Sequence, residues 1–189
     1  GVDDYDSYEF LRDFVGRVSE SGCEVFLVHA RKAWLKGLSP KQNREIPELN
    51  YDRVYQLKKD FPHLEIIING GVTTLEQSTE HLQHLDGVMV GREAYTNPYL
   101  LARVDQDIYG SIDPIKTREQ IAVEFLRYID NELSKGTKLN AMTRHILGLF
   151  HGMPGARLYR RHISENAFKP GATIEVLTTA LEKTSGVIS

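Results

Sequence analysis

Three short apolar runs, separated by helix-like patterns, constrain the fold of this chain more than any other feature. They cover residues 25–29, 66–68 and 87–90. Near-continuous apolar runs are typical of strands buried on both faces, and strands that alternate with helices form parallel sheets. The sequence therefore predicts an α/β part with a parallel sheet and crossover helices.

The helix-like patterns carry start and stop signals of their own. Apolar side chains recur at helical spacing within residues 6–21, and again after Asn50 and Thr73. The expected starts are Asp6 with Glu9, Asn50 alone, and Thr73 with Glu76, and the expected stops are Gly22 and Pro62. Helix and strand patterns therefore alternate three times in the first half of the chain.

The second half has helix signals and no strand-like run before its last few residues. Residues 1–110 carry 12 basic and 18 acidic side chains (net −6), whereas residues 111–189 carry 11 and 8 (net +3). The turn-rich residues 109–114 between them are typical of a linker. We predict a partial barrel over residues 1–110 and a C-terminal helical bundle over residues 111–189. The bundle helices are expected near 117–136, 139–150, 156–167 and 173–184, the first of them starting at a capping box of Thr117 and Gln120.

Composition excludes several classes of protein. The 189 residues are 41% hydrophobic and 26% charged, and no apolar run approaches the roughly 18 residues that cross a bilayer. The net charge of −3 excludes nucleic-acid binding through overall charge alone, so such binding needs a local patch. The single cysteine, Cys23, cannot form an intramolecular disulfide, which indicates a reducing, cytoplasmic location.

Glycine-bearing polar segments follow two of the predicted strands. Asn69, Gly70 and Gly71 close the second, and Gly91 and Arg92 close the third. In an eightfold βα barrel this carboxyl edge carries the active site, and loops after the last two strands often bind phosphate. Glycines let backbone N–H groups approach an anion, and arginine matches phosphate geometry. The residues alone leave two interpretations open, a phosphate site and a pair of tight turns.

The histidines and the cysteine are weaker signals. His29 ends the first strand at the same edge, where it either contacts a cofactor or simply packs. His81 and His84 have no cysteine or carboxylate cluster beside them, so we predict solvated surface and no metal site. Cys23 precedes the first strand, away from the expected active edge, and is predicted to be a structural thiol.

Basic residues gather in two places. The loop after the first strand holds five of them around Trp34, and a predicted helix presents three arginines on one face. The loop residues are Arg31, Lys32, Lys36, Lys41 and Arg44, and the helix residues are Arg157, Arg160 and Arg161. Such runs are usually solvated faces, but a basic loop with an aromatic, beside a net-positive bundle, also suits a nucleic-acid backbone.

Several segments match the pattern of a known enzyme family. The longest is VHARKAWLKGLSPK at residues 28–41. The others are NREIP at 43–47, NGG at 69–71, GVMVGR at 87–92, TRH at 143–145, GAR at 155–157 and SENA at 164–167. Together they resemble the tRNA-dihydrouridine synthases, most closely the bacterial A subfamily. The resemblance covers essentially the whole chain, and residues 28–41 are its most discriminating part.

The resemblance implies an FMN-binding (β/α)8 barrel followed by a helical tRNA-binding domain. Such enzymes reduce D-loop uridines, here of the 20/20a type, to 5,6-dihydrouridine with FMN that NADPH recharges. The implied FMN contacts are His29, the cradle of Asn69, Gly70 and Gly71, and the phosphate grip of Gly91 and Arg92. The implied tRNA contacts are Lys41, Arg44, Arg157 and Arg160.

The chain also departs from the family pattern. The family's catalytic cysteine belongs to a loop after the fourth barrel strand, whereas the three strands here correspond to the sixth, seventh and eighth. Cys23 does not occupy that position, so no residue of this chain is expected to be catalytic. Since no methionine precedes Gly1 and a full barrel needs about 250 residues, we expect a C-terminal piece, inactive alone. Its open sheet edge predicts self-association.

Two alternatives stay open at the level of the sequence. One is a piece of another FMN-dependent barrel oxidoreductase, such as a dihydroorotate dehydrogenase-like enzyme, which has no use for a basic bundle. The other is a non-catalytic RNA-binding module without a cofactor. We expect tRNA as the partner, and neither a membrane nor a metal.

Overall fold

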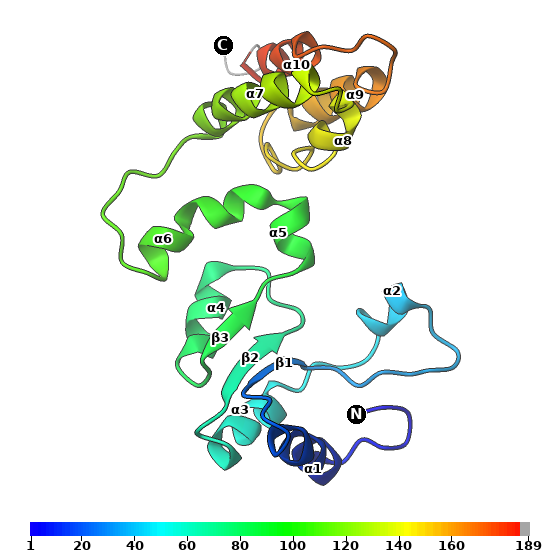
Figure 1. Cartoon of the computed structure of the whole chain (residues 1–189), viewed down its shortest axis with the longest axis vertical. Coiled ribbons are helices and arrows are strands. Elements are labelled where there is room, and N and C mark those ends of the chain that lie inside the picture. The colour runs from blue at the N-terminus through cyan, green and yellow to red at the C-terminus, as the bar shows by residue number, and fades with distance from the viewer. Residues whose placement is uncertain (186–189) are drawn as a thin grey trace. The chain divides into compact units, whose positions relative to one another are not determined.

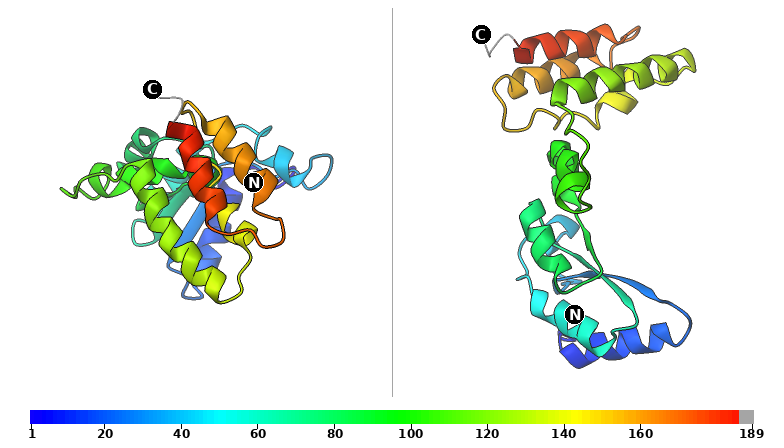
Figure 2. Two further views of the ribbon diagram at one scale, coloured as in Figure 1. Left: turned by 90° about the horizontal axis from the view of Figure 1, so that it is seen from above. Right: turned by 90° about the vertical axis from the view of Figure 1, so that its left-hand side faces the viewer.

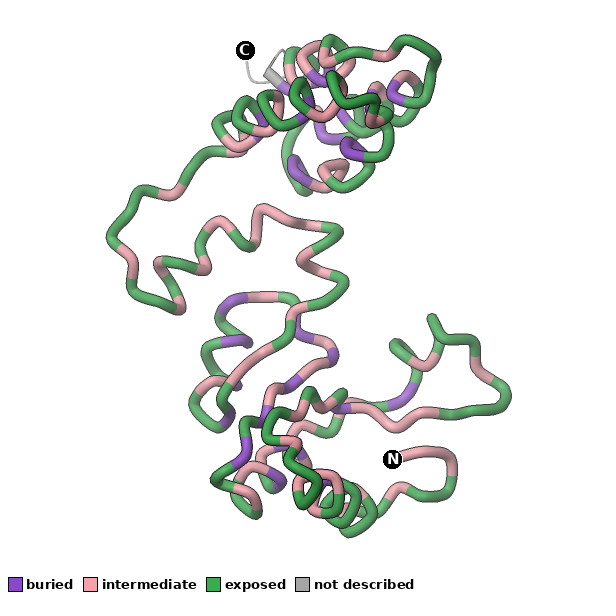
Figure 3. The backbone as a smooth tube through the Cα atoms, in the orientation of Figure 1, coloured by how far each residue is buried: buried purple, intermediate pink, exposed green. Residues whose placement is uncertain are grey.

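The computed structural model describes residues 1–185, which divide into two compact units. The first unit is Gly1–Gly91, and the second begins at Arg92. Each unit has a buried apolar cluster of its own (Figure 3). The predicted division after Gly110, between a cofactor part and an RNA part, falls inside the second unit and stays a prediction.

A three-stranded parallel sheet organises the first unit, as predicted (Figure 1). Its strands β1 (Val25–His29), β2 (Glu65–Asn69) and β3 (Gly87–Met89) lie in that order. Helix α1 (Tyr8–Ser19) precedes β1, and α3 (Tyr51–Asp60) and α4 (Leu75–Leu82) are the crossover helices. A short helix, α2 (Pro40–Asn43), lies in the loop after β1. The first unit is therefore an α/β structure.

Alternate strand residues form the core of this unit with α1 and α3. Ile66 and Ile68 of β2 are fully buried in the same cluster as Leu57 of α3. On the opposite face Leu27 is 57% exposed and Met89 46%. The prediction that β1 is buried on both faces is therefore wrong for residues 1–185, because the helices of this unit cover one face and leave the other open.

The start of α1 differs from the prediction by one residue. The Ser7 hydroxyl, and not the Asp6 carboxylate, accepts the backbone N–H of Phe10 at 3.1 Å. Asp6 is unavailable because its carboxylate pairs with Arg53 at 2.5 Å. The predicted start of α3 is confirmed, since the Asn50 side chain accepts the N–H of Arg53 at 3.2 Å.

Capping boxes start α4 and the long helix α7 (Arg118–Ser134). The box of α4 consists of Thr74 and Gln77 and not of the predicted Thr73 and Glu76. Gln77 determines this register because its side-chain oxygen accepts the N–H groups of Thr73 and Thr74. The box of α7 consists of Thr117 and Gln120, as predicted.

The second unit is helical throughout its regular structure. Tyr159, Ile129 and Leu177 are fully buried in its core, and α9 and α10 lie alongside each other (Figure 2). Besides α7, its helices are α5 (Arg92–Thr96), the 3₁₀ helix η1 (Pro98–Arg103), α6 (Val104–Asp107), α8 (Leu139–Thr143), α9 (Ala156–Asn166) and α10 (Glu175–Ser185). None of the described helices is long and apolar enough to cross a membrane.

Two parts of the second unit differ from the prediction. The sequence did not indicate α5, η1 or α6. The helix expected over 139–150 ends at Thr143, and the chain then turns so that Gly148 meets the backbone of Thr96. A Cβ on Gly148 would lie 2.2 Å from the Thr96 carbonyl oxygen, so this approach requires glycine.

Candidate functional site

The carboxyl ends of the three strands meet at one edge of the first unit. The sheet register pairs His29 with Asn69, and Asn69 with Met89. The Asn69 side-chain Nδ2 donates to the Met89 carbonyl at 2.8 Å, which ties the ends of β2 and β3 together. The structure therefore brings His29, Asn69 and the glycines after β2 to one edge, as the strand pattern predicts.

Gly70 and Gly71 form a turn that requires glycine at both positions. Their φ angles of 118° and 74° lie in the region that other residues avoid. A Cβ on Gly71 would also lie 2.5 Å from the Leu49 Cδ1 and 2.9 Å from the Tyr51 hydroxyl oxygen. The N–H groups of the two glycines have no hydrogen-bond partner among residues 1–185. Free N–H donors in a turn without side chains suit an anion such as phosphate.

Gly91 contributes space and not an unusual backbone conformation. Its φ is not positive, and a Cβ at this position would meet only the Asn69 Nδ2, at 3.9 Å. Gly91 therefore leaves room beside the Asn69 amide at the edge of the sheet. Arg92 follows directly as the first residue of α5 and belongs to the second unit.

A cluster of two half-buried tyrosines and one buried histidine supports the glycine turn from the helix side. The Tyr51 hydroxyl donates to the Gly70 carbonyl at 3.0 Å. The Tyr51 ring meets the His81 ring edge-on at 4.5 Å, and the Tyr55 hydroxyl lies 2.7 Å from the His81 Nδ1. The cluster therefore links α3 and α4 to the turn.

His81 corrects one prediction from the sequence. It is 5% exposed and not solvated surface, and burial lowers the pKa of its imidazole. His84, three residues on, is exposed, as predicted. Within residues 1–185, no three His, Cys, Asp or Glu side chains gather closely enough to hold a metal ion.

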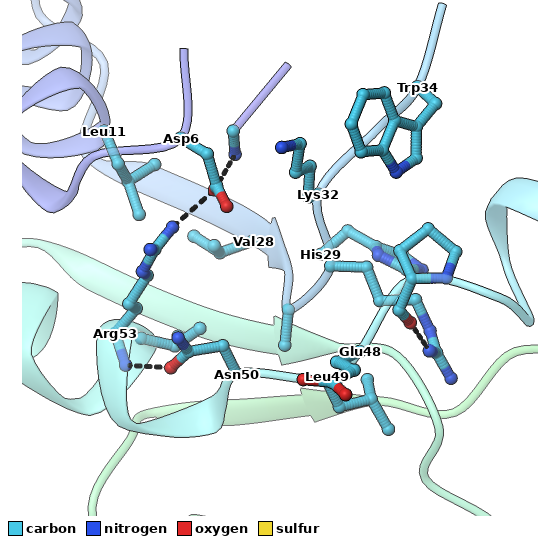
Figure 4. Close-up of a pocket in the computed structure, with 15 residues that line it drawn as sticks. Asp6, Leu11, Val28, His29, Lys32, Trp34, Glu48, Leu49, Asn50 and Arg53 are labelled. Atoms are coloured by element: carbon cyan, nitrogen blue, oxygen red, sulfur yellow. Dashed lines mark hydrogen bonds and ion pairs between the residues drawn. The ribbon is translucent and has the colours of Figure 1, made fainter. Parts of the chain in front are cut away.

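A pocket of about 350 Å³ opens at the carboxyl end of β1 (Figure 4). Charged and aromatic side chains line the pocket. Asp6, just before α1, forms an ion pair there with Arg53 of α3. In the loop after β1, the Lys32 ammonium lies 4.1 Å from the centre of the Trp34 ring. Of the six predicted cofactor residues, His29 alone lines this pocket. The pocket therefore lies next to the predicted cofactor edge without coinciding with it.

The basic loop after β1 is ordered by Asn43. Its side-chain oxygen accepts the Trp34 N–H at 2.7 Å, and its Nδ2 donates to the Trp34 carbonyl at 2.8 Å. These two hydrogen bonds across the loop hold α2 in place, with Lys41 exposed on the helix and Arg44 exposed at its C-cap. The Lys41 ammonium pairs with no group among the described residues.

Helix α9 exposes the three arginines that the sequence places on one face. Arg161 pairs with Glu165 at 2.7 Å, whereas the guanidinium groups of Arg157 and Arg160 have no partner among residues 1–185. Tyr159, fully buried, anchors the opposite face of the helix in the core. Arg157 and Arg160 are therefore cations free to bind an external anion. They lie in the second unit, whereas Lys41 and Arg44 lie in the first.

Comparison with known proteins decides the family. A family model described as dihydrouridine synthase matches residues 1–185. The chain belongs to the dihydrouridine synthase family. Proteins of Vibrio vulnificus and Escherichia coli K12, both named tRNA-dihydrouridine(20/20a) synthase, are 67% and 61% identical over 184 and 183 residues. Those stretches are 97% and 96% of this chain, but 56% and 53% of the two proteins, so the chain spans about half the length of these relatives.

The one cysteine of this dihydrouridine synthase chain lies away from the carboxyl edge. Cys23 is half-buried just before β1, at the opposite end of the strand from His29. Its thiol donates to the Val25 carbonyl at 3.5 Å, a local contact at the amino edge of the sheet. The placement agrees with a structural role for Cys23.

Sequence reasoning missed the residues that support the glycine turn. Tyr51 and Tyr55 are four residues apart, which places them on one face of α3, and His81 follows the buried Leu75 and Ser78 of α4 at three-residue spacing. That spacing was visible in the sequence. Which turn the tyrosines approach was not visible, because it depends on how α3 packs against the loop after β2.

Proposed function

We propose that this chain is the part of a tRNA-dihydrouridine(20/20a) synthase that holds the FMN phosphate and contributes tRNA contacts. The observation that carries the proposal is the glycine turn after β2, with two unpartnered N–H donors, in a member of the dihydrouridine synthase family. Its three βα units would be the sixth to eighth of a (β/α)8 barrel, whose last strand ends commonly bind phosphate.

The residues at the carboxyl edge fit a flavin phosphate. Gly70 and Gly71 would donate N–H groups, Gly91 leaves room, and Arg92 would add a charged fork. His29 and Asn69 would contact the flavin side of the ligand. Bound FMN, recharged by NADPH, would supply the hydride that reduces uracil.

We assign no proton donor for the reaction to any of residues 1–185. Cys23 lies at the amino edge, and the proposed cofactor site lies at the carboxyl edge. We therefore propose that the catalytic cysteine belongs to another part of the synthase and that this chain alone forms no dihydrouridine. Family membership argues against the dihydroorotate dehydrogenase-like alternative.

The proposed tRNA contacts are the exposed cations Lys41, Arg44, Arg157 and Arg160. A uridine inside folded tRNA must be extruded before it can be reduced, so contacts to the tRNA backbone would position it. Because the proposed substrate is tRNA, we propose that the reaction takes place in the cytoplasm.

Binding of unmodified tRNA transcript to this chain tests the proposal. The double variant Arg157→Gln and Arg160→Gln should raise the Kd about tenfold and lower the salt dependence of log Kd by about 2, since two phosphate contacts are lost. The readout is fluorescence anisotropy of labelled tRNA over a range of salt concentrations.

The matched control is Arg161→Gln on the same helix. Because Arg161 is already paired with Glu165, its loss should change the Kd less than about threefold. A double variant that binds tRNA like the unmodified chain at every salt concentration would contradict the proposed contacts.

A further inference from the structure

Two neighbouring hollows on the second unit share one exposed aromatic side chain. Their volumes are about 430 and 350 Å³, and Phe168 lines both. Phe168 lies two residues after the end of α9 and is 65% exposed. A phenylalanine ring so exposed at the mouth of a hollow presents a flat apolar face to any occupant.

The charge around these hollows has one sign. Their lining residues include Lys138, Arg144 and Lys169 and no aspartate or glutamate. Lys138 and Arg144 are exposed and have no ion-pair partner among residues 1–185. Lys169 donates to the Asn166 side chain at 2.7 Å. The hollows therefore suit a ligand that carries a negative charge beside a flat apolar surface.

Two neutral polar groups in the hollows are also unused. The Asn140 amide lines both hollows, and the Ser164 hydroxyl lines the smaller one. Both residues are exposed, and neither side chain has a hydrogen-bond partner within the described part of the chain. An amide and a hydroxyl beside an aromatic ring offer the donors and acceptors that a base edge needs.

The hollows continue the arginine face of α9. Arg157, Arg160 and Ser164 follow one another at three- and four-residue spacing, and Phe168 lies four residues further along the chain. Positions at this spacing share one side of a helix. An RNA backbone that follows the arginines would therefore reach Phe168 at the carboxyl end of α9.

We propose that the Phe168 hollows bind one unpaired RNA base, stacked on the Phe168 ring with its edge toward Asn140 and Ser164, and with the adjoining phosphate held by Arg144 and Lys138. The inference rests on the proposed function for the nature of the ligand. It adds a nucleotide site to the backbone contacts on α9. Stacking on an exposed aromatic is how proteins hold single-stranded nucleic acid.

The probe is fluorescently labelled oligo-uridine of about 12 nucleotides, a length within the range of single-strand sites. Phe168→Ala should weaken its binding about tenfold without changing the salt dependence, because stacking releases no counterions. Arg144→Gln should lower the salt dependence by about 1. The control is Ile112→Ala, which removes another highly exposed apolar side chain of the same unit and should leave binding unchanged.

A second variant lets tryptophan fluorescence report directly on stacking at position 168. Phe168→Trp, in a chain whose single tryptophan is removed by Trp34→Phe, should keep the affinity and show quenched fluorescence when oligo-uridine binds. Duplex RNA of the same length should compete poorly, since its bases are not free to stack. These results together would support the nucleotide site.

Three results would overturn the nucleotide site. They are normal oligo-uridine binding by Phe168→Ala, unchanged tryptophan fluorescence on binding, and equal competition by duplex RNA. If tRNA binding still depends on Arg157 and Arg160, only the inference about Phe168 fails. If the unmodified chain binds neither tRNA nor oligo-uridine, the proposed tRNA contacts fail with it.

Discussion

The fold and the proposed cofactor site both depend on the absence of a side chain at Gly71. Its left-handed backbone and the 2.5 Å approach of the Leu49 methyl to a Cβ position both demand glycine. The same lack of a side chain leaves its N–H open to a phosphate. A substitution here therefore acts on stability and on ligand binding together, and a control must separate the two.

Gly71→Ala should lower the free energy of unfolding by about 1–3 kcal/mol, because alanine meets both the strained φ and the contact with Leu49. It should also abolish FMN binding. Urea unfolding followed by the fluorescence of Trp34, which lies in the same unit, measures the first effect. Quenching of FMN fluorescence measures the second.

Gly22→Ala is the matched control for strain. Gly22 has a φ of 90° in the same unit, but a Cβ there would meet nothing within 4 Å. Gly22→Ala should lower the free energy of unfolding by roughly 1 kcal/mol and leave FMN binding intact. Equal losses of stability in the two variants would show that the contact with Leu49 does not matter, and FMN binding by Gly71→Ala would contradict the proposed cradle.

At the scale of elements, α3 and α4 determine the shape of the glycine turn through the Tyr51, Tyr55 and His81 cluster. The neutral His81 imidazole can accept the Tyr55 hydroxyl proton at Nδ1, which agrees with a lowered pKa. The groups around His81 are the two tyrosines, whose pKa values burial raises, and the nearby Glu80 and His84. Protonation of His81 would remove Nδ1 as an acceptor for the Tyr55 hydroxyl and would place a positive charge in a buried position.

We expect the first unit to lose stability as pH falls through about 6.5, the pKa of an unfolded histidine. Because burial lowers the pKa of folded His81, the unfolded chain binds the proton more readily, and acid favours unfolding. Urea unfolding by Trp34 fluorescence between pH 5.5 and 8 measures the dependence. His81→Gln should flatten it.

His84→Gln is the control for this pH dependence, since His84 is exposed. It should leave the slope of the unmodified chain unchanged. Burial also lowers the pKa of His162, but that residue lies in the second unit and is common to all variants. Identical slopes for the unmodified chain and His81→Gln would rule out His81 as the source.

At the scale of the molecule, the first unit presents one open sheet face. Val25, Leu27 and Met89 are each between 45% and 57% exposed there. Exposed apolar side chains on one face of a sheet favour association with another apolar surface. In a whole (β/α)8 barrel this face would be the packed interior.

The chain should therefore self-associate as its concentration rises. Sedimentation velocity should show dimers or larger species, and Leu27→Lys should shift them toward monomer, because a charge would be placed on the open face. The control is Val123→Lys on α7, where the side chain is 52% exposed and the helix belongs to the other unit. A monomer at every concentration, or equal association by both variants, would contradict the expectation.

Local chemistry made much of the fold predictable. The apolar runs predict β1 to β3 to within one residue at every end, and Asn50 and Thr117 predict the starts of α3 and α7. Short elements such as α5 and α6 were missed because four or five residues carry too little periodicity to be recognised. The starts of α1 and α4 were misplaced by one residue because tertiary and side-chain partners decided which candidate cap was free.

The parallel α/β part, the helical part and the glycines at the strand ends were predictable without a structure, because they depend on residue type and on spacing along the chain. Four other properties became clear from the packed molecule: Tyr51 supports Gly70, His81 is buried, Arg161 is paired while Arg157 and Arg160 are free, and Phe168 lines two hollows. Those properties depend on distances between residues far apart in sequence. Packing sets such distances, and no local pattern encodes them.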